Sequence, residues 1–576
     1  MKKHITLITM LLCVSMTALA VPAKRGGIVK TMADGTEKVL YLHGDETFHY
    51  YTDAEGNRYT GGTDGRFVQA GPMTPATAKA MRNAAPRRMV RNSDTESPLN
   101  LAPRGLLILV SFSDVSFSTS EAEIDSMLNG SNYSREYTYR YQRKNYTVKA
   151  EGSAKQYFKE QSGGQYVPHF DIVGPVTVSR EQSYYGQNDE YYNQDMYAEE
   201  LLVEACQIAD EKFGVDFTQY DCNDDGQIDF VYMLYAGYGE ADGGEDYTIW
   251  PHSYSLQENY YLSKRKYGKG KAKVYLDGKL LNRYACSNEL NSGSKQYNGI
   301  GTICHEFSHV LGLPDLYDTG TYDASGNTTY HHQKLLGNWD ILDAGPYNND
   351  GNTPPAYSAY ERFFMGWLTP EIISEQTGGH YTLEDLKTSH KAYLLTPSGQ
   401  HNLIGNDPDP AYFLLLENRQ QTGWDTYLPW HGMLLTKIAY NADNWANNMV
   451  NNYADNLGVD LLEADNLAPA EEYDEYYQDW YPQDGTYGKP GDAFPTGATN
   501  YRMSFFSMYN IEENDAVISF DINVRTALDD LLDAGEQVLD IYDLLGNRQP
   551  VHAAGSLPRG VYIVRTNRTV KKIYIQ

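Results

Sequence analysis

The feature that most constrains this chain of 576 residues is the run H-E-F-S-H-V-L-G-L-P-D-L-Y-D at residues 305–318. Positions four apart lie one turn above each other on an α-helix, so His305 and His309 project from one face and can share a single ion, with Glu306 beside them. A structural zinc site fills all four positions with protein ligands, whereas a hydrolytic site keeps three and leaves the fourth to water. The run therefore predicts a hydrolytic zinc site, provided that a third ligand follows.

The third ligand is predicted from the way this helix ends. Gly312 can adopt the left-handed conformation that ends a helix, and Pro314 cannot continue one, so the backbone is expected to turn sharply and bring Asp315 back toward the histidines. Asp318 is the alternative ligand, or it orients a histidine, caps the segment or binds calcium. We predict Asp315.

These residues predict a reaction. A bound zinc ion polarises a scissile carbonyl and lowers the pKa of a water molecule to about 7, and Glu306 is predicted to pass the proton of that water to the leaving amine. We further expect the strand that ends near Ala236 to offer its edge to an extended substrate. Three side chains are candidates for stabilising the oxyanion, although each is an ordinary packing or surface residue by default: His252, Tyr347 and Tyr357.

The extended motif resembles a known group of enzymes. The pattern H-E-x-x-H-x-x-G-x-x-D is similar to metzincins that have an aspartate as third ligand, and the longer string ending in L-P-D-L-Y-D resembles the immune inhibitor A family of secreted bacterial metallopeptidases. Other segments extend the resemblance over most of residues 100–510, namely residues 230–240, 249–252, 337–345, 358–368 and 416–420. The resemblance implies a metzincin-like catalytic domain that binds zinc and acts on proteins.

One position departs from the family's pattern. The stretch W-D-I-L-D resembles the Met-turn that lies beneath the metal in this family, but Leu342 stands where methionine is expected. Because leucine has a similar volume and no metal bond is lost, we expect a slightly altered floor and an active site.

A second metal signal is the loop D-C-N-D-D-G-Q-I-D at residues 221–229. It places oxygen ligands at the spacing of an EF-hand loop, but Tyr232 occupies the twelfth position, where a glutamate is expected, and a strand follows in place of a helix. We predict one structural calcium ion, with a solvated acidic turn as the alternative. The predicted ligands are Asp221, Asn223, Asp225, Gln227 and Asp229.

Charge and the first residues of the chain indicate the compartment. The net charge of −29 argues against nucleic acid or an anionic membrane surface as a partner, because both would repel the chain. Lys2 and Lys3 precede an apolar run that ends in A-L-A at residues 18–20, which is typical of an export signal. No later segment is expected to span a membrane. The four cysteines that follow, at positions 206, 222, 286 and 304, permit up to two disulfides in an exported protein.

We divide the chain into a signal peptide (1–20), a propeptide with its linker (21–103), a catalytic domain (104–370), a β-rich, sandwich-like region (371–525) and a small C-terminal unit (526–576). The expected fold class is α+β. Residues 42–59 read as a hairpin around D-A-E-G-N and residues 197–213 as a helix. Residues 84–98 read as an exposed cleavable joint, with a plain flexible connector as the alternative.

The last fifty residues have short strands separated by glycine turns, in an order and spacing that resemble the sorting domain read by the type IX secretion machinery of Bacteroidetes. An adhesion or carbohydrate-binding module is the alternative. This resemblance implies export through the periplasm to the outer cell surface or the medium.

Two functions remain open on the sequence alone. The first is a secreted zinc endopeptidase made as a zymogen. The second is a catalytically inactive, calcium-stabilised surface adhesin on a peptidase scaffold, suggested by Leu342 and by the large, tyrosine-rich β region.

Overall fold

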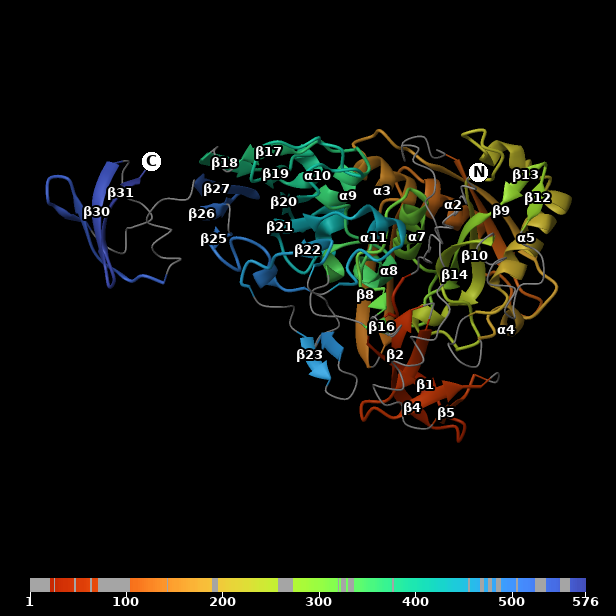
Figure 1. The fold of residues 1–576 in the computed structure, drawn as a ribbon. Helices are drawn as coiled ribbons and strands as arrows, with labels where there is room; N and C mark the ends of the chain where they lie inside the picture. Colours follow the sequence, from red (N-terminus) through yellow and green to blue (C-terminus); the bar gives the residue numbers. More distant parts are fainter. Residues whose placement is uncertain are drawn as a thin grey trace, which may run out of the picture.

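The computed structural model describes residues 21–575 except for residues 25, 46–47, 63–64, 71–103, 142, 189–194, 257–272, 320, 323–327, 330–335, 375–377, 454–455, 467–470, 475–478, 483–487, 504–505, 524–534 and 550–559. The described part contains a small N-terminal sheet, a central α/β region, a β-rich region and a C-terminal sheet (Figure 1). None of the helices within it is long and apolar enough to cross a membrane.

The central region is built on a five-stranded sheet in the order β11-β14-β10-β6-β9. Four of its strands run parallel, and β11 is antiparallel to β14 at one edge. The bounds are β6 (Arg104–Ser111), β9 (His169–Thr177), β10 (Val231–Tyr238), β11 (His252–Ser255) and β14 (Arg283–Leu290). The expected α+β class therefore applies to the chain as a mixture of helices and strands, while this sheet has the mainly parallel character of an α/β unit.

Continuous apolar runs in β6 and β10 follow from burial on both faces of the sheet. Along β6, Leu107 and Leu109 belong to one hydrophobic core, whereas Leu106, Ile108 and Val110 belong to a second core on the other face. The second core includes one face of α5 (Ala198–Phe213), the helix that the sequence predicts. The first core includes α7 (Gly301–Val310), which carries the histidine motif.

The strand predicted to present an edge to substrate is placed differently. β10 lies in the interior of the sheet, between β14 and β6, so both of its edges are used in strand pairing. The prediction of an available edge near Ala236 is therefore wrong. Its apolar run F-V-Y-M-L-Y is the sequence of a strand buried on both faces.

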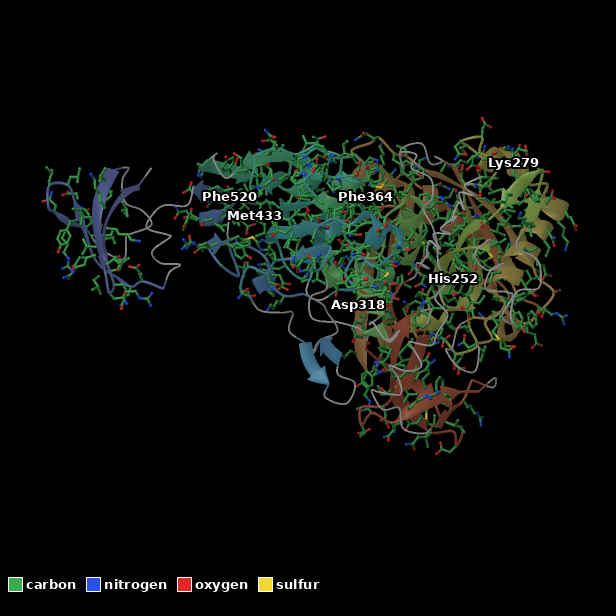
Figure 2. The ribbon with its side chains drawn as sticks, viewed as in Figure 1. His252, Lys279, Asp318, Phe364, Met433 and Phe520 are labelled. Atoms are coloured by element: carbon green, nitrogen blue, oxygen red, sulfur yellow. The ribbon has the colours of Figure 1, made fainter. Side chains whose placement is uncertain are left out.

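The β-rich region contains two sheets that share one hydrophobic core, in the orders β17-β19-β20-β21-β22 and β18-β27-β26-β25. Met433 of β21 and Phe520 of β27 lie in this core and close together in Figure 2. The bounds are β17 (Glu371–Ser374), β18 (Gly379–Leu383), β19 (Tyr393–Thr396), β20 (Tyr412–Arg419), β21 (Gly432–Ala439), β22 (Val459–Leu461), β25 (Tyr501–Arg502), β26 (Ser507–Asn514) and β27 (Val517–Asn523).

The N-terminal sheet has the order β1-β2-β3-β4-β5. The predicted hairpin is present between β3 and β4, where the Asp53 carboxylate accepts the N–H groups of Glu55 and Asn57. The bounds are β1 (Gly27–Thr31), β2 (Glu37–Asp45), β3 (Phe48–Thr52), β4 (Arg58–Gly61) and β5 (Phe67–Gln69). We call residues 21–70 the leader.

The C-terminal sheet is antiparallel, in the order β29-β28-β30-β31, with bounds β28 (Val538–Asp543), β29 (Arg548–Gln549), β30 (Gly560–Thr566) and β31 (Val570–Ile575). The remaining α-helices and strands are α2 (Glu121–Asn129), β7 (Ser134–Tyr141), β8 (Lys144–Glu151), α3 (Ala154–Gln161), α4 (Gln182–Tyr185), β12 (Val274–Leu276), β13 (Lys279–Leu281), β15 (Thr321–Tyr322), β16 (Thr328–Thr329), α8 (Asn348–Gly351), α9 (Ala359–Phe364), α10 (Leu386–Ser389), α11 (Ala442–Ala446), β23 (Glu471–Asp474) and β24 (Asp479–Pro482).

Candidate active site

The two histidines of α7 point at each other, with their Nε2 atoms 3.0 Å apart. Nδ1 of His305 lies 2.6 Å from the Ile341 carbonyl oxygen, and Nδ1 of His309 lies 2.8 Å from that of Leu313. A carbonyl only accepts, so each Nδ1 carries the proton and donates, and each Nε2 presents a lone pair. Two buried lone pairs that face each other at this distance repel unless a proton or a metal ion lies between them.

Asp315 completes the group. Its Oδ1 lies 3.4 Å from Nε2 of His305 and 3.3 Å from Nε2 of His309, and all three side chains are buried. The three potential ligand atoms lie within 4.8 Å of one another, and this is the one such cluster of three or more His, Cys, Asp or Glu side chains in the described residues. Two imidazole nitrogens and one carboxylate oxygen are a donor set that fits zinc with an open fourth position.

The protonation states also suit a metal. Burial acts to raise the pKa of Asp315, but the neighbouring His309 and His305 outweigh this effect and lower it to about 2. Burial and the adjacent His309 lower the pKa of His305, against the opposing effect of Asp315. A metal ion needs an ionised carboxylate and neutral imidazoles, and both shifts favour those forms.

The chain returns to the histidines as the sequence predicts. α7 ends at Val310, and Gly312 has a φ of +102°, in the left-handed region that favours glycine. The turn brings back Asp315. The alternative ligand, Asp318, is buried but lies outside the group of His305, His309 and Asp315 among the described residues.

The floor of the site is the turn that contains Leu342, which is fully buried. The Ile341 carbonyl accepts the Nδ1–H of His305, and the Leu342 carbonyl accepts the N–H of Leu316, the residue after Asp315. The turn therefore supports both ligand-bearing segments through main-chain carbonyls. The Leu342 side chain packs in the hydrophobic core, as a methionine would, and makes no bond that a metal needs.

Glu306 is fully buried, and its Oε1 lies 3.3 Å from the backbone nitrogen of Val21 in the leader. The leader's first residues are held there from two sides. Trp250 Nε1 donates to the Val21 carbonyl at 3.1 Å, and the Tyr347 hydroxyl donates to the Pro22 carbonyl at 2.6 Å. The leader therefore reaches the carboxylate that we predict to be the general base.

The rest of the leader docks on an acidic segment at residues 240–246. His49 Nε2 lies 2.7 Å from Glu240 Oε1, and the buried Lys30 ammonium donates to the Gly243 carbonyl at 3.0 Å. Burial, together with nearby Glu240 and Glu245, raises the pKa of Asp246 to about 7, while Lys30 acts in the opposite direction.

The three oxyanion candidates have different surroundings. The buried His252 ring contacts the Trp250 carbonyl and the Tyr284 hydroxyl, and the Tyr357 hydroxyl lies 2.5 Å from Ser308 Oγ. The Tyr347 hydroxyl contacts the leader segment that lies against Glu306. It donates to a main-chain carbonyl there, as an oxyanion-stabilising group would.

In the predicted calcium loop, the side-chain oxygens accept hydrogen bonds from backbone N–H groups of the loop, and one carboxylate pairs with a lysine. Asp221 accepts the N–H groups of Asp225 and Gly226, and its Oδ2 lies 2.5 Å from the Lys279 ammonium. Asp229 accepts the N–H of Cys222. Asn223 Oδ1 accepts the N–H of Asp225 at 3.0 Å, and Asp225 Oδ1 accepts the N–H of Gln227 at 2.7 Å. These carboxylates do not form a cluster with metal-ligand geometry in the described residues, so calcium stays a prediction.

The loop lies away from the histidine motif: Lys279 and Asp318 are far apart in Figure 2. The four cysteines after the predicted signal, all of which the structure describes, are free thiols. Cys206, Cys286 and Cys304 are buried, and Cys222 is exposed.

Sequence reasoning missed Asn448, whose side chain contacts Asp315 through two hydrogen bonds. The signal was the asparagine-rich string N-N-M-V-N-N-Y at residues 447–453, which reads simply as a loop. It also missed the leader contacts of Val21 and Trp250, because short apolar segments give no pairing signal.

Comparisons with known proteins agree with this geometry. Residues 101–368 match the family model described as the immune inhibitor A peptidase M6 catalytic domain. The chain is 28% identical over 184 residues to a pre-pro-metalloprotease PrtV of Vibrio cholerae serotype O1 (strain M66-2), covering 29% of this chain and 19% of that protein. It is 31% identical over 183 residues to immune inhibitor A of Bacillus thuringiensis subsp. alesti, covering 29% of this chain and 25% of that protein.

These alignments span a quarter or less of the relatives' own length. The matched family segment contains α7, the group of His305, His309 and Asp315, and the turn at Leu342. The comparisons therefore relate residues 101–368 to the peptidase M6 catalytic domain of the immune inhibitor A family, and support a metallopeptidase domain in this segment.

Proposed function

We propose that the chain is a zinc-dependent endopeptidase, made as a zymogen and secreted, that hydrolyses peptide bonds in proteins. The observation that carries the proposal is the convergence of His305, His309 and Asp315 in one buried group, with Glu306 next to it on α7. His305, His309 and Asp315 would hold the ion.

Zinc, when bound, would supply a Lewis acid that polarises the scissile carbonyl and lowers the pKa of a water molecule. The carboxylate of Glu306 would take a proton from the attacking water and give it to the departing amine. The Ile341 and Leu313 carbonyls accept from Nδ1 of the two histidines, which leaves each Nε2 as the atom that would bind the ion. The Tyr347 hydroxyl is placed to donate to a substrate carbonyl, as it now donates to that of Pro22.

Latency is supported by the position of the leader. Val21 lies against Glu306, and its neighbours bond to Trp250 and Tyr347, so a substrate chain cannot enter while the leader occupies this place. Removal of a signal peptide after residue 20 would leave Val21 as the N-terminus, and its ammonium group would pair with the Glu306 carboxylate. Cleavage within residues 84–98 followed by release of the leader would then open the site.

Further parts of the proposal rest on sequence patterns. We assign residues 1–20 to an export signal and residues 526–576 to sorting by type IX secretion machinery, with passage through the periplasm to the outer surface or the medium. The antiparallel sheet of β28–β31 is compatible with that role. We also keep one structural calcium ion at residues 221–229, with Lys279 as its competitor for Asp221.

The adhesin remains the second candidate function, because Leu342 departs from the family's pattern. It is opposed by the intact metal-binding group beneath the leader. Reconstitution distinguishes the two. The leader-free protein should lose casein hydrolysis when its metal is stripped by a chelator and recover it with one equivalent of zinc, and no hydrolysis before or after this treatment would favour the adhesin.

A further inference from the structure

Asn448 holds the third ligand through both of its side-chain atoms. Its Oδ1 accepts the backbone N–H of Asp315 at 2.7 Å, and its Nδ2 donates to Asp315 Oδ2, also at 2.7 Å. Asp315 Oδ2 is therefore engaged by Asn448, while Oδ1 faces His305 and His309. Both Asn448 and Asp315 are buried, so water does not compete for these bonds.

The loop that carries Asn448 holds the rest of the ligand segment as well. The Thr319 hydroxyl donates to the Asn448 carbonyl at 2.5 Å, and Thr319 N–H donates to Asn452 Oδ1 at 3.0 Å. Asn451 Nδ2 donates to the Leu316 carbonyl at 2.7 Å. Asn451 also bonds to both main-chain groups of Val459, the first residue of β22, which anchors the loop in the sheet.

The asparagines that bind residues 315–319 lie outside the matched catalytic domain. The family model ends at residue 368, whereas the loop at 447–452 lies between α11 and β22 in the β-rich region. The hydrogen bonds from Asn448, Asn451 and Asn452 to residues 315–319 establish the contact between the two regions.

The backbone at Asn448 also fits this role. Its φ is +51°, in the left-handed region that glycine, asparagine and aspartate adopt more readily than other residues. Of these residues, only asparagine carries a side-chain amide that can donate to the Asp315 carboxylate and accept its backbone N–H.

We propose that Asn448 is a positioning residue for the metal site, and that the β-rich region therefore contributes to metal affinity. By donating to Oδ2, it turns Oδ1 of Asp315 toward the histidines and fixes the carboxylate in that rotamer. This inference rests on the proposed zinc site. Partners that orient metal ligands in this way typically contribute 10–100-fold to metal affinity.

The test is the zinc affinity of the full chain carrying Asn448→Gly, measured by competition with a chromophoric chelator. Glycine keeps the left-handed backbone and removes only the amide. Zinc affinity is expected to fall by at least about 10-fold. The matched control is Asn510→Gly, which makes the same change at an exposed asparagine with a φ of +51° in β26 and should leave zinc affinity unchanged.

A double-mutant cycle with Asp315→Ala separates positioning from a general folding defect. If Asn448 acts through Asp315, the Asn448→Gly change costs no further zinc affinity once that carboxylate is gone. Equal losses in both backgrounds, or a zinc affinity of Asn448→Gly within twofold of wild type, would overturn the inference while leaving the peptidase intact. Absence of zinc binding by the wild-type chain would overturn both.

Discussion

The backbone nitrogen of Val21 lies 3.3 Å from Oε1 of Glu306, although 285 positions separate them in the sequence. This contact places the start of the leader on the catalytic carboxylate that we propose. The leader is held there by its own sheet, which docks on residues 240–246. Latency should therefore depend on anchors that lie outside the site.

Lys30→Met tests such an anchor. The Lys30 ammonium is buried and donates to the Gly243 carbonyl, so its loss leaves that buried acceptor unpaired at a cost of about 1–3 kcal/mol. The uncleaved zymogen should then hydrolyse casein about 5–160-fold faster than the uncleaved wild type. Lys149→Met, the same change at an exposed lysine of the catalytic region, is the control. If the uncleaved Lys30→Met protein hydrolyses casein no faster than the uncleaved wild type, and gains activity only after the leader is removed, this anchoring role would be contradicted.

Leader docking should weaken as pH rises through about 7, the pKa of Asp246 when the leader is docked. A carboxyl group whose pKa is raised by docking contributes free energy that is complete below its free pKa, near 3.9, and is lost as pH rises through the docked value. Basal activity of the zymogen, normalised to that of the leader-free enzyme at each pH, should increase about tenfold from pH 6 to pH 8.

The matched variant for this effect is Asp246→Asn, which cannot ionise and should flatten the normalised profile. An unchanged pH dependence in Asp246→Asn would assign the titration to another group at the interface.

Leu342→Met tests the one departure from the family's pattern. The side chain is fully buried in the hydrophobic core, and the exchange keeps its volume, so the free energy of unfolding should change by less than about 1.5 kcal/mol. Because the turn holds His305 and Leu316 through main-chain carbonyls, kcat/KM should stay within about threefold of wild type. A gain of a hundredfold or more would mean that leucine impairs the native site.

The sequence predicted the parts of the site that lie close together along the chain. Two local features of the sequence bring Asp315 to the histidines. Helix periodicity places His305 and His309 on one face, and the left-handed backbone conformation available to Gly312 allows the turn that follows. The hairpin around Asp53 and the helix over residues 198–213 were predicted for the same reason.

Contacts between distant segments were not predictable in this way. The order of strands depends on pairing partners far along the chain, so the buried run of β10 was misread as an edge. The hydrogen bonds between Asn448 and Asp315 join residues 133 positions apart, and a polar loop sequence carries no information about its partner. Likewise, the ammonium of Lys279 beside Asp221 could not be foreseen from an acidic loop alone.

The most direct test of the account is metal analysis of the leader-free protein, combined with casein hydrolysis by wild type and Glu306→Gln. Glutamine keeps the shape of the side chain and cannot accept a proton, so both proteins should contain one zinc ion per chain, while the variant loses about 10²–10⁴-fold in hydrolysis. Glu136→Gln, at an exposed glutamate of β7, should behave as wild type. A wild-type protein without zinc, or a Glu306→Gln protein that still hydrolyses casein at the wild-type rate, would contradict the account.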